Sequence, residues 1–270
     1  MSYLENGLKR MGVLLVLVAA GTLGGVNAKA DEFDSRVNPK VIESNGSIRI
    51  LFNGEIKNGD AESIVTLHDR AVADIEKKNG VGPQEPPKLT ITSPGGNVAE
   101  AMAIGRWIRK MKGTVYVPFD SPCFSSCVYV VAAGYQRYIF GDIGIHRPFL
   151  NKLDNESPGK ILQAILVQSR AYFFEMGVPE RLADDMFSVE PEQNKILSKE
   201  QLSAYRLNQP DSGYKEEIAI AEAKRLGISR IEYNKRRAGF LKDLEVCELL
   251  RPESVMSKCA SDSAKRRGID

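Results

Sequence analysis

The chain has 270 residues, which is enough to bury a sizeable core in one or two domains. Hydrophobic residues make up 43% and charged residues 27%, an ordinary balance for a soluble globular protein. The net charge of +2 is too small to indicate nucleic acid as a partner. The local basic clusters 235–237 and 265–267 are interpreted as solvated faces.

The N-terminus has the pattern of a secretory signal peptide. Lys9 and Arg10 precede an uncharged apolar run, residues 11–26, and small residues follow that end in Ala-Lys-Ala at Ala30. We therefore expect residues 1–30 to be a signal peptide and the protein to be periplasmic or secreted. The alternative is an uncleaved anchor facing the periplasm, although the run is short for a membrane span.

Export favours disulfides among the four cysteines. Local pairing, Cys123–Cys127 and Cys247–Cys259, is the simplest of the three arrangements. Zinc is the rival, but the chain has only two histidines and their spacing matches no zinc-finger pattern. No metal and no cofactor are expected.

Strand and helix signals alternate through the middle of the chain, after a polar lead-in over 31–46. Strands are expected at 47–52, 88–92, 114–119 and 137–140, and helices at 62–77, 98–112, 126–133, 158–176 and 179–187. This alternation predicts a parallel sheet in an α/β domain over residues 31–210.

The chain is helical and charged in character from Asp211 onward. A capping box, Ser229 with Glu232, predicts the start of a helix that runs to about Cys247. Residues 211–270 are therefore predicted to be a helical extension.

Three short segments carry groups suited to catalysis. The turn Ser93–Gly96 (S-P-G-G) lies between a strand and a helix, where paired glycines let backbone N–H groups approach an oxyanion. The segment Ser121–Cys127 places serines at a helix start, either as caps or beside N–H groups that stabilise negative charge. His146 follows in a Gly- and Pro-containing loop, whereas His68 lies on an apolar helical stripe and is interpreted as a packed helix residue.

Together these segments resemble the serine peptidases related to the Clp protease proteolytic subunit and signal peptide peptidase A, within the crotonase-like superfamily. That family has an S-P-G-G turn, then a serine opening an apolar helix that ends in A-G, then an I-H-x-P histidine. The resemblance covers about residues 47–207 and is similar in detail to an exported branch with C-x-S-x-C around the serine. It implies a parallel-sheet superhelix of ββα units.

The resemblance also implies roles for individual residues. Ungapped counting back from Ala133-Gly134 places Ser125, rather than Ser126, on the nucleophile. His146 falls on the base, and the N–H groups of Gly96 (or Gly95) and Ser126 fall on the oxyanion hole. A Cys123–Cys127 bridge would rigidify the nucleophile loop; the alternative is two buried thiols.

The third member of the family's triad is an aspartate, and here it falls on Asn194. An amide can orient an imidazole but cannot neutralise an imidazolium, and this exchange costs about 10⁴ in rate in a serine triad. The carboxylates of Asp142, Asp184 and Asp185 are substitutes that the sequence leaves open.

Three functions follow as hypotheses. The first is an exported serine peptidase acting on a peptide or protein substrate through Ser125 and His146. The second is a catalytically inactive relative that binds a peptide or protein partner in the same groove, as Asn194 favours. The third, a crotonase-type acyl-CoA enzyme, is disfavoured by export. Homo-oligomers are expected by analogy with the family, and membrane association only through the N-terminal segment.

Overall fold

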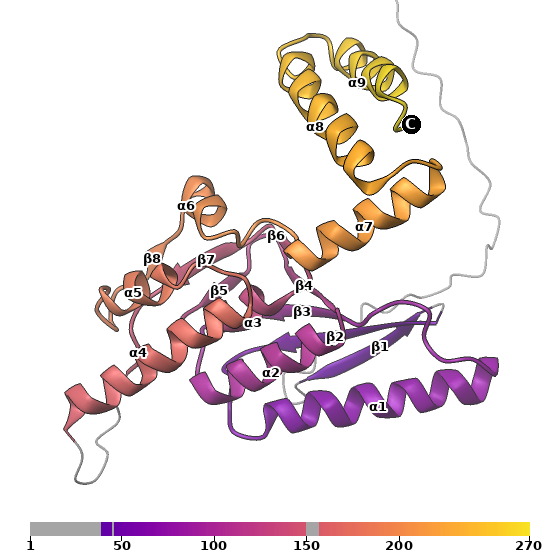
Figure 1. Ribbon diagram of the computed structural model, residues 1–270. Coiled ribbons are helices and arrows are strands. Elements are labelled where there is room, and N and C mark those ends of the chain that lie inside the picture. Colours follow the sequence, from indigo (N-terminus) through magenta and orange to yellow (C-terminus); the bar gives the residue numbers. More distant parts are fainter. Residues whose placement is uncertain (1–38, 45, 150–156) are drawn as a thin grey trace, which may run out of the picture. The chain divides into compact units, whose positions relative to one another are not determined.

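A computed structural model describes residues 39–44, 46–149 and 157–270, all within one compact unit spanning Ser35–Asp270. Strands and helices alternate along most of this unit (Figure 1), which confirms the α/β class predicted from the sequence. The expected signal peptide, residues 1–30, lies outside the described residues.

The larger sheet in the described part of the chain has five strands. In spatial order they are β1 (Lys40–Ser44), β2 (Ser47–Asn53), β3 (Lys88–Thr92), β4 (Thr114–Val117) and β6 (Gln136–Ile139). Strands β2, β3, β4 and β6 are parallel, as predicted, and β1 is antiparallel to β2. The polar lead-in expected over residues 31–46 is therefore corrected, because part of it forms strand β1. This short strand lies at the edge of the sheet and takes its hydrogen bonds from β2.

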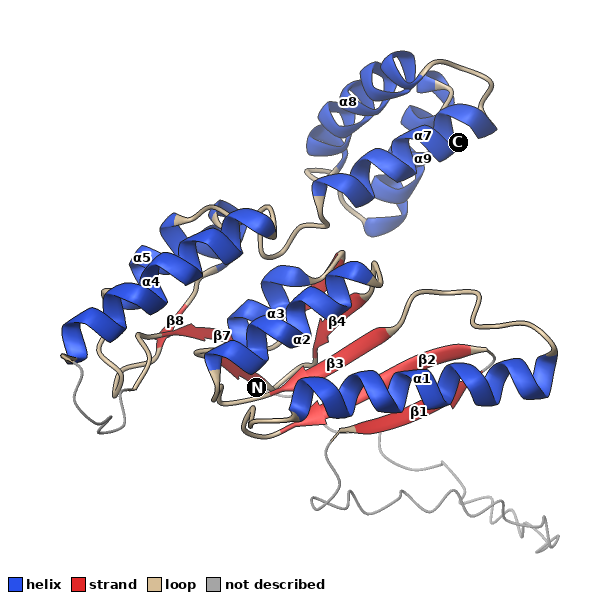
Figure 2. Ribbon diagram, turned by 60° about the horizontal axis from the view of Figure 1, so that its bottom comes forward, coloured by secondary structure: helices blue, strands red, loops and turns tan. Residues whose placement is uncertain are grey.

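Alternation along β2 shows which face of this sheet is covered. Ile48, Ile50 and Phe52 are buried, whereas the residues between them are exposed or half-buried. The covering helices are α1 (Asp60–Asn79) and α2 (Val98–Lys110), which run along the sheet (Figure 2). The period-2 pattern therefore builds one apolar face and leaves the other partly open.

A smaller sheet carries the site-bearing segments. Its strands are β5 (Pro122–Phe124), β7 (Asp142–Ile145) and β8 (Lys195–Ile196), with β5 and β7 parallel and β8 antiparallel to β7. A single bridge between Ser93 and Cys123 connects the end of β3 to β5. The helices that follow in this part are α3 (Cys127–Ala133), α4 (Pro158–Glu175), α5 (Arg181–Phe187) and α6 (Lys199–Ala204).

The C-terminal part is helical, as the sequence predicts, and consists of α7 (Ser212–Arg225), α8 (Arg230–Cys247) and α9 (Glu253–Arg267). Helix α8 begins where the cap was expected, because the Ser229 hydroxyl accepts a hydrogen bond from the Glu232 N–H at 3.1 Å. The division into domains at residue 210 stays a prediction.

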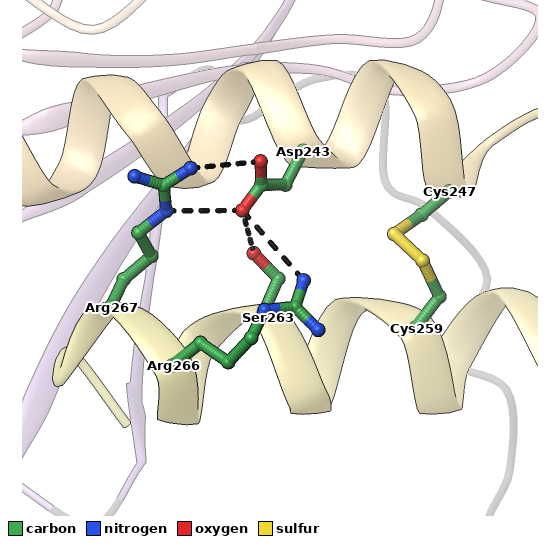
Figure 3. The surroundings of a disulfide bond; sticks show 6 residues. All are labelled: Asp243, Cys247, Cys259, Ser263, Arg266 and Arg267. Carbon is green, nitrogen blue, oxygen red and sulfur yellow. Dashed lines mark hydrogen bonds and ion pairs between the residues drawn. A yellow bond between two sulfur atoms is a disulfide. The ribbon is translucent and has the colours of Figure 1, made fainter.

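Two kinds of cross-link hold α8 against α9 (Figure 3). The Cys247–Cys259 disulfide joins the end of α8 to α9. Asp243 accepts hydrogen bonds from Arg267 and Ser263, and these bonds lower the pKa of its carboxyl to about 2. No helix in the described part of the chain has the length and apolar character needed to cross a membrane.

Candidate active site

Ser125 occupies a strained turn between β5 and α3. Its φ is +53°, in the left-handed region that costs a residue with a Cβ about 1–2 kcal/mol. The Ser125 N–H donates to the Gly144 carbonyl at 2.9 Å, which ties the turn to β7. Strained backbone of this kind concentrates at functional sites, because the surrounding structure must enforce it.

The residues on both sides of Ser125 are fixed. A disulfide joins Cys123 to Cys127 across the turn, with 5.3 Å between their Cα atoms. The Phe124 ring packs on Gly144, where an added Cβ would lie 2.6 Å from the ring. The predicted pairing of these cysteines is therefore present in the structure.

Gly95 and Gly96 form a corner directly against this turn. Both have positive φ, +103° and +140°. A Cβ on Gly95 would lie 2.7 Å from the Ser125 Cβ, and one on Gly96 would lie 2.2 Å from the Ile56 carbonyl oxygen. Glycine is required at both positions for conformation and for space.

The corner and the helix start supply backbone N–H groups beside Ser125. The Gly95 N–H is already used, because it donates to the Ser93 hydroxyl at 3.0 Å. Within the described residues, neither the Gly96 N–H nor the Ser126 N–H has an acceptor. Of the three residues predicted for the oxyanion hole, Gly96 and Ser126 thus keep an unengaged donor.

His146 follows β7 and is only 5% exposed. Its Nδ1 lies 2.8 Å from the Arg147 carbonyl oxygen. Because a carbonyl oxygen only accepts, this contact requires the proton on Nδ1 and leaves the Nε2 lone pair free to act as a base. The ring also packs edge-on against Phe149, with 5.5 Å between the centroids.

Ser125 and His146 line one cavity of about 1090 Å³ together with Gly95 and Gly96. No hydrogen bond joins the two side chains within the described part of the chain. Catalytic hydrogen bonds often form only once a substrate is bound, so the lack of this bond is consistent with a catalytic pair. Ser126 is 1% exposed and does not line the cavity, so the hydroxyl that faces it is that of Ser125.

Asn194 lies immediately before β8 and is exposed. The register pairs Gly144 with Ile196 and Ile145 with Lys195, and Asn194 and His146 lie just beyond the last of these pairs. No side-chain hydrogen bond links the two among the described residues, and the role of Asn194 stays a prediction.

The alternative carboxylates have other neighbours. Asp184 pairs with Arg170, and Asp185 accepts a hydrogen bond from the Tyr205 hydroxyl. Asp142 opens β7 and is exposed. None of the three lines the cavity that Ser125 and His146 share.

Several other residues that line this cavity were not predicted from the sequence. Ile161 and Ile165 of α4 contribute apolar side chains, and Glu55 and Lys57 contribute charged ones. Glu55 and Lys57 follow a parallel strand, so their position at the same sheet edge as Ser93 is a signal that sequence reasoning could have used. The α4 residues offered no such signal.

His68 is not part of this site. It is 4% exposed on α1, and its ring packs edge-on against Trp107 of α2 at 5.4 Å between centroids. No group of three or more His, Cys, Asp or Glu side chains in the described ranges is placed to hold a metal ion.

Comparison with known proteins adds little beyond this geometry. No family model and no curated protein matches the chain. Two solved structures that are similar to it are variants of the 1510-N membrane-bound stomatin-specific protease, one of them in complex with a substrate peptide. Both are 19% identical with a TM-score of 0.44, and the matches cover 63% and 62% of this chain and 82% and 76% of theirs. Similarity of this degree does not define a function.

Proposed function

We propose that this protein is an exported serine hydrolase that cleaves peptide bonds, with Ser125 as nucleophile and His146 as general base. The observation that carries the proposal is a serine held at positive φ that shares one cavity with a buried histidine, beside two unengaged backbone N–H groups. A nucleophile, a base and oxyanion donors are the parts that acyl transfer needs.

In the proposed mechanism, the Ser125 Oγ attacks the substrate carbonyl carbon while Nε2 of His146 takes its proton. The developing oxyanion is stabilised by the N–H groups of Gly96 and Ser126. His146 then returns the proton to the leaving amine, and water hydrolyses the acyl-enzyme by the same route. The Arg147 carbonyl fixes the tautomer of His146 but carries no full charge, so we expect slower turnover than an Asp-containing triad gives.

The two disulfides are typical of an oxidising compartment, which supports a periplasmic or secreted location. The proposed substrate is a peptide or unfolded protein bound in the cavity. Homo-oligomerisation, a place in the C-x-S-x-C branch and membrane association through the N-terminal segment are parts of the same proposal.

A second candidate is an inactive protein that binds a peptide in this cavity. The observation that favours it is the environment of His146, whose Nδ1 contacts the Arg147 carbonyl oxygen and no carboxylate among the described residues. The two candidates differ in whether Ser125 reacts.

Labelling with a fluorophosphonate probe distinguishes them. We expect the wild type to be labelled at Ser125, Ser125→Ala to lose labelling completely, and His146→Ala to lose at least 100-fold in labelling rate, the lower end of the general-base contribution. Ser188→Ala, at an exposed serine, and His68→Gln, at the other histidine, serve as matched controls that keep the wild-type rate. A folded wild type that is not labelled would support the binding protein instead.

A further inference from the structure

We propose that the Cys123–Cys127 disulfide positions the nucleophile, by holding Ser125 in its left-handed conformation and keeping the Ser126 N–H beside it. This inference rests on the proposed function of Ser125. It assigns to the two cysteines a catalytic positioning role in addition to any contribution to stability.

Both ends of the disulfide are anchored in rigid structure. Cys123 lies in β5, which pairs with β7 on one side and bridges to Ser93 on the other. Cys127 is the first residue of α3, all seven residues of which are buried. The bond therefore connects a fixed strand to a fixed helix across the three residues that include Ser125.

The span of the turn shows what the disulfide prevents. Four residues of extended chain would separate the Cα atoms of Cys123 and Cys127 by about 13 Å. Their separation is 5.3 Å, and a disulfide tolerates no more than about 7 Å. Extension of the segment that contains Ser125 is therefore incompatible with the bond.

The contacts made by Gly95 depend on this restraint. The Gly95 Cα lies against Ser125 and the Ser126 backbone nitrogen, and an added Cβ would be 3.1 Å from that nitrogen. If Ser125 relaxed, the Ser126 N–H would leave the position in which it faces the glycine corner. Displacements of about 1 Å in a catalytic group can reduce rates by about 100-fold.

A role in overall stability alone explains this disulfide less well. The chain-entropy benefit of a disulfide grows with the length of the loop that it closes, so a separation of 4 residues gives less than the 12 of Cys247–Cys259. Both Cys123 and Cys127 are 0% exposed, which also makes them unsuitable for thiol exchange with a partner.

The test compares Cys123→Ala/Cys127→Ala with the matched control Cys247→Ala/Cys259→Ala, which removes the other disulfide. For each protein, the rate constant for fluorophosphonate labelling is measured well below its melting temperature. We expect a loss of about 10- to 100-fold in the first variant and the wild-type rate in the control. If Cys123→Ala/Cys127→Ala does not fold, Cys123→Val/Cys127→Ala fills more of the vacated volume and replaces it.

Amide hydrogen exchange provides a readout that does not depend on activity. The Ser125 N–H, which donates to Gly144, should exchange at least about tenfold faster in the variant and unchanged in the control. A wild type that is not labelled would refute the proposed function, and the exchange rates would then decide the inference. Unchanged exchange, or an unchanged labelling rate when the wild type is labelled, would overturn it.

Discussion

The backbone conformation of Ser125 costs stability, while its hydroxyl is placed in the cavity. Among the described residues, four that are not glycine have positive φ, namely Lys112, Asp120, Ser125 and Arg206. Of these, Ser125 alone lines the cavity. A glycine would fit its conformation without the steric cost, so a serine here indicates that the hydroxyl is used.

Replacing this serine by glycine should therefore stabilise the protein and inactivate it. We expect Ser125→Gly to raise the free energy of unfolding by about 0.5–1 kcal/mol, the left-handed penalty less the entropy cost of glycine. Urea denaturation measures the gain, and fluorophosphonate labelling should be absent. Arg206→Gly, at an exposed residue with φ +59°, should gain similar stability and keep labelling. A less stable Ser125→Gly would contradict this account of the turn.

At the scale of elements, Arg137 of β6 joins the ends of several helices through hydrogen bonds. It is 7% exposed and donates to the carbonyl oxygens of Ala132 and Gly134 at the end of α3, and to Met176 just after α4. A further hydrogen bond reaches the Arg206 carbonyl at 2.7 Å. Helix ends leave carbonyls unpaired and carry negative potential, which a buried cation satisfies. Burial lowers the Arg137 pKa to about 10, so it remains charged at neutral pH.

This network predicts a large cost for a conservative change. Arg137→Lys keeps the charge but cannot supply the planar set of donors, so the free energy of unfolding should fall by about 3 kcal/mol. Arg170→Lys changes a pair with Asp184 that is partly exposed, and should cost less than about 1 kcal/mol. Equal midpoints for the two variants in urea denaturation would show that Arg137 has no such role.

Across the whole molecule, the two disulfides differ in burial. Cys123 and Cys127 are fully buried, whereas Cys259 on α9 is only partly covered. Thiol exchange needs a thiolate to reach a disulfide sulfur in line, so accessibility sets the order of reduction.

Mild reduction of the native protein should therefore open Cys247–Cys259 first. Alkylation followed by peptide mass spectrometry should find label on Cys247 and Cys259 while Cys123 and Cys127 stay paired. Reduction should lower the free energy of unfolding by about 3 kcal/mol, the chain-entropy value for this loop. The destabilised helices should be α8 and α9, and labelling at Ser125 should be unchanged. Earlier reduction of Cys123–Cys127 would mean that the structure covering this disulfide opens readily in solution, which would contradict the prediction.

The sequence by itself determined the α/β class and most of the regular elements, because apolar periodicity is a local property of the chain. It also singled out Ser125, His146 and the two glycines, through the resemblance of three ordered motifs to a known peptidase family, which is visible without coordinates. Strands β1, β5, β7 and β8 escaped notice. They are two to five residues long and depend on partners distant in sequence.

Only the tertiary structure decided which groups of the site are free and which are engaged. The positive φ of Ser125 is held by packing between segments, as its N–H bond to Gly144 shows. The use of the Gly95 N–H by Ser93 and the contact of His146 with the Arg147 carbonyl join near neighbours in sequence, but only the folded backbone brings these atoms within hydrogen-bond distance. The α4 wall of the cavity has the same origin. Hydrogen bonds and close contacts depend on distances in space, and those distances are set when the whole chain has folded.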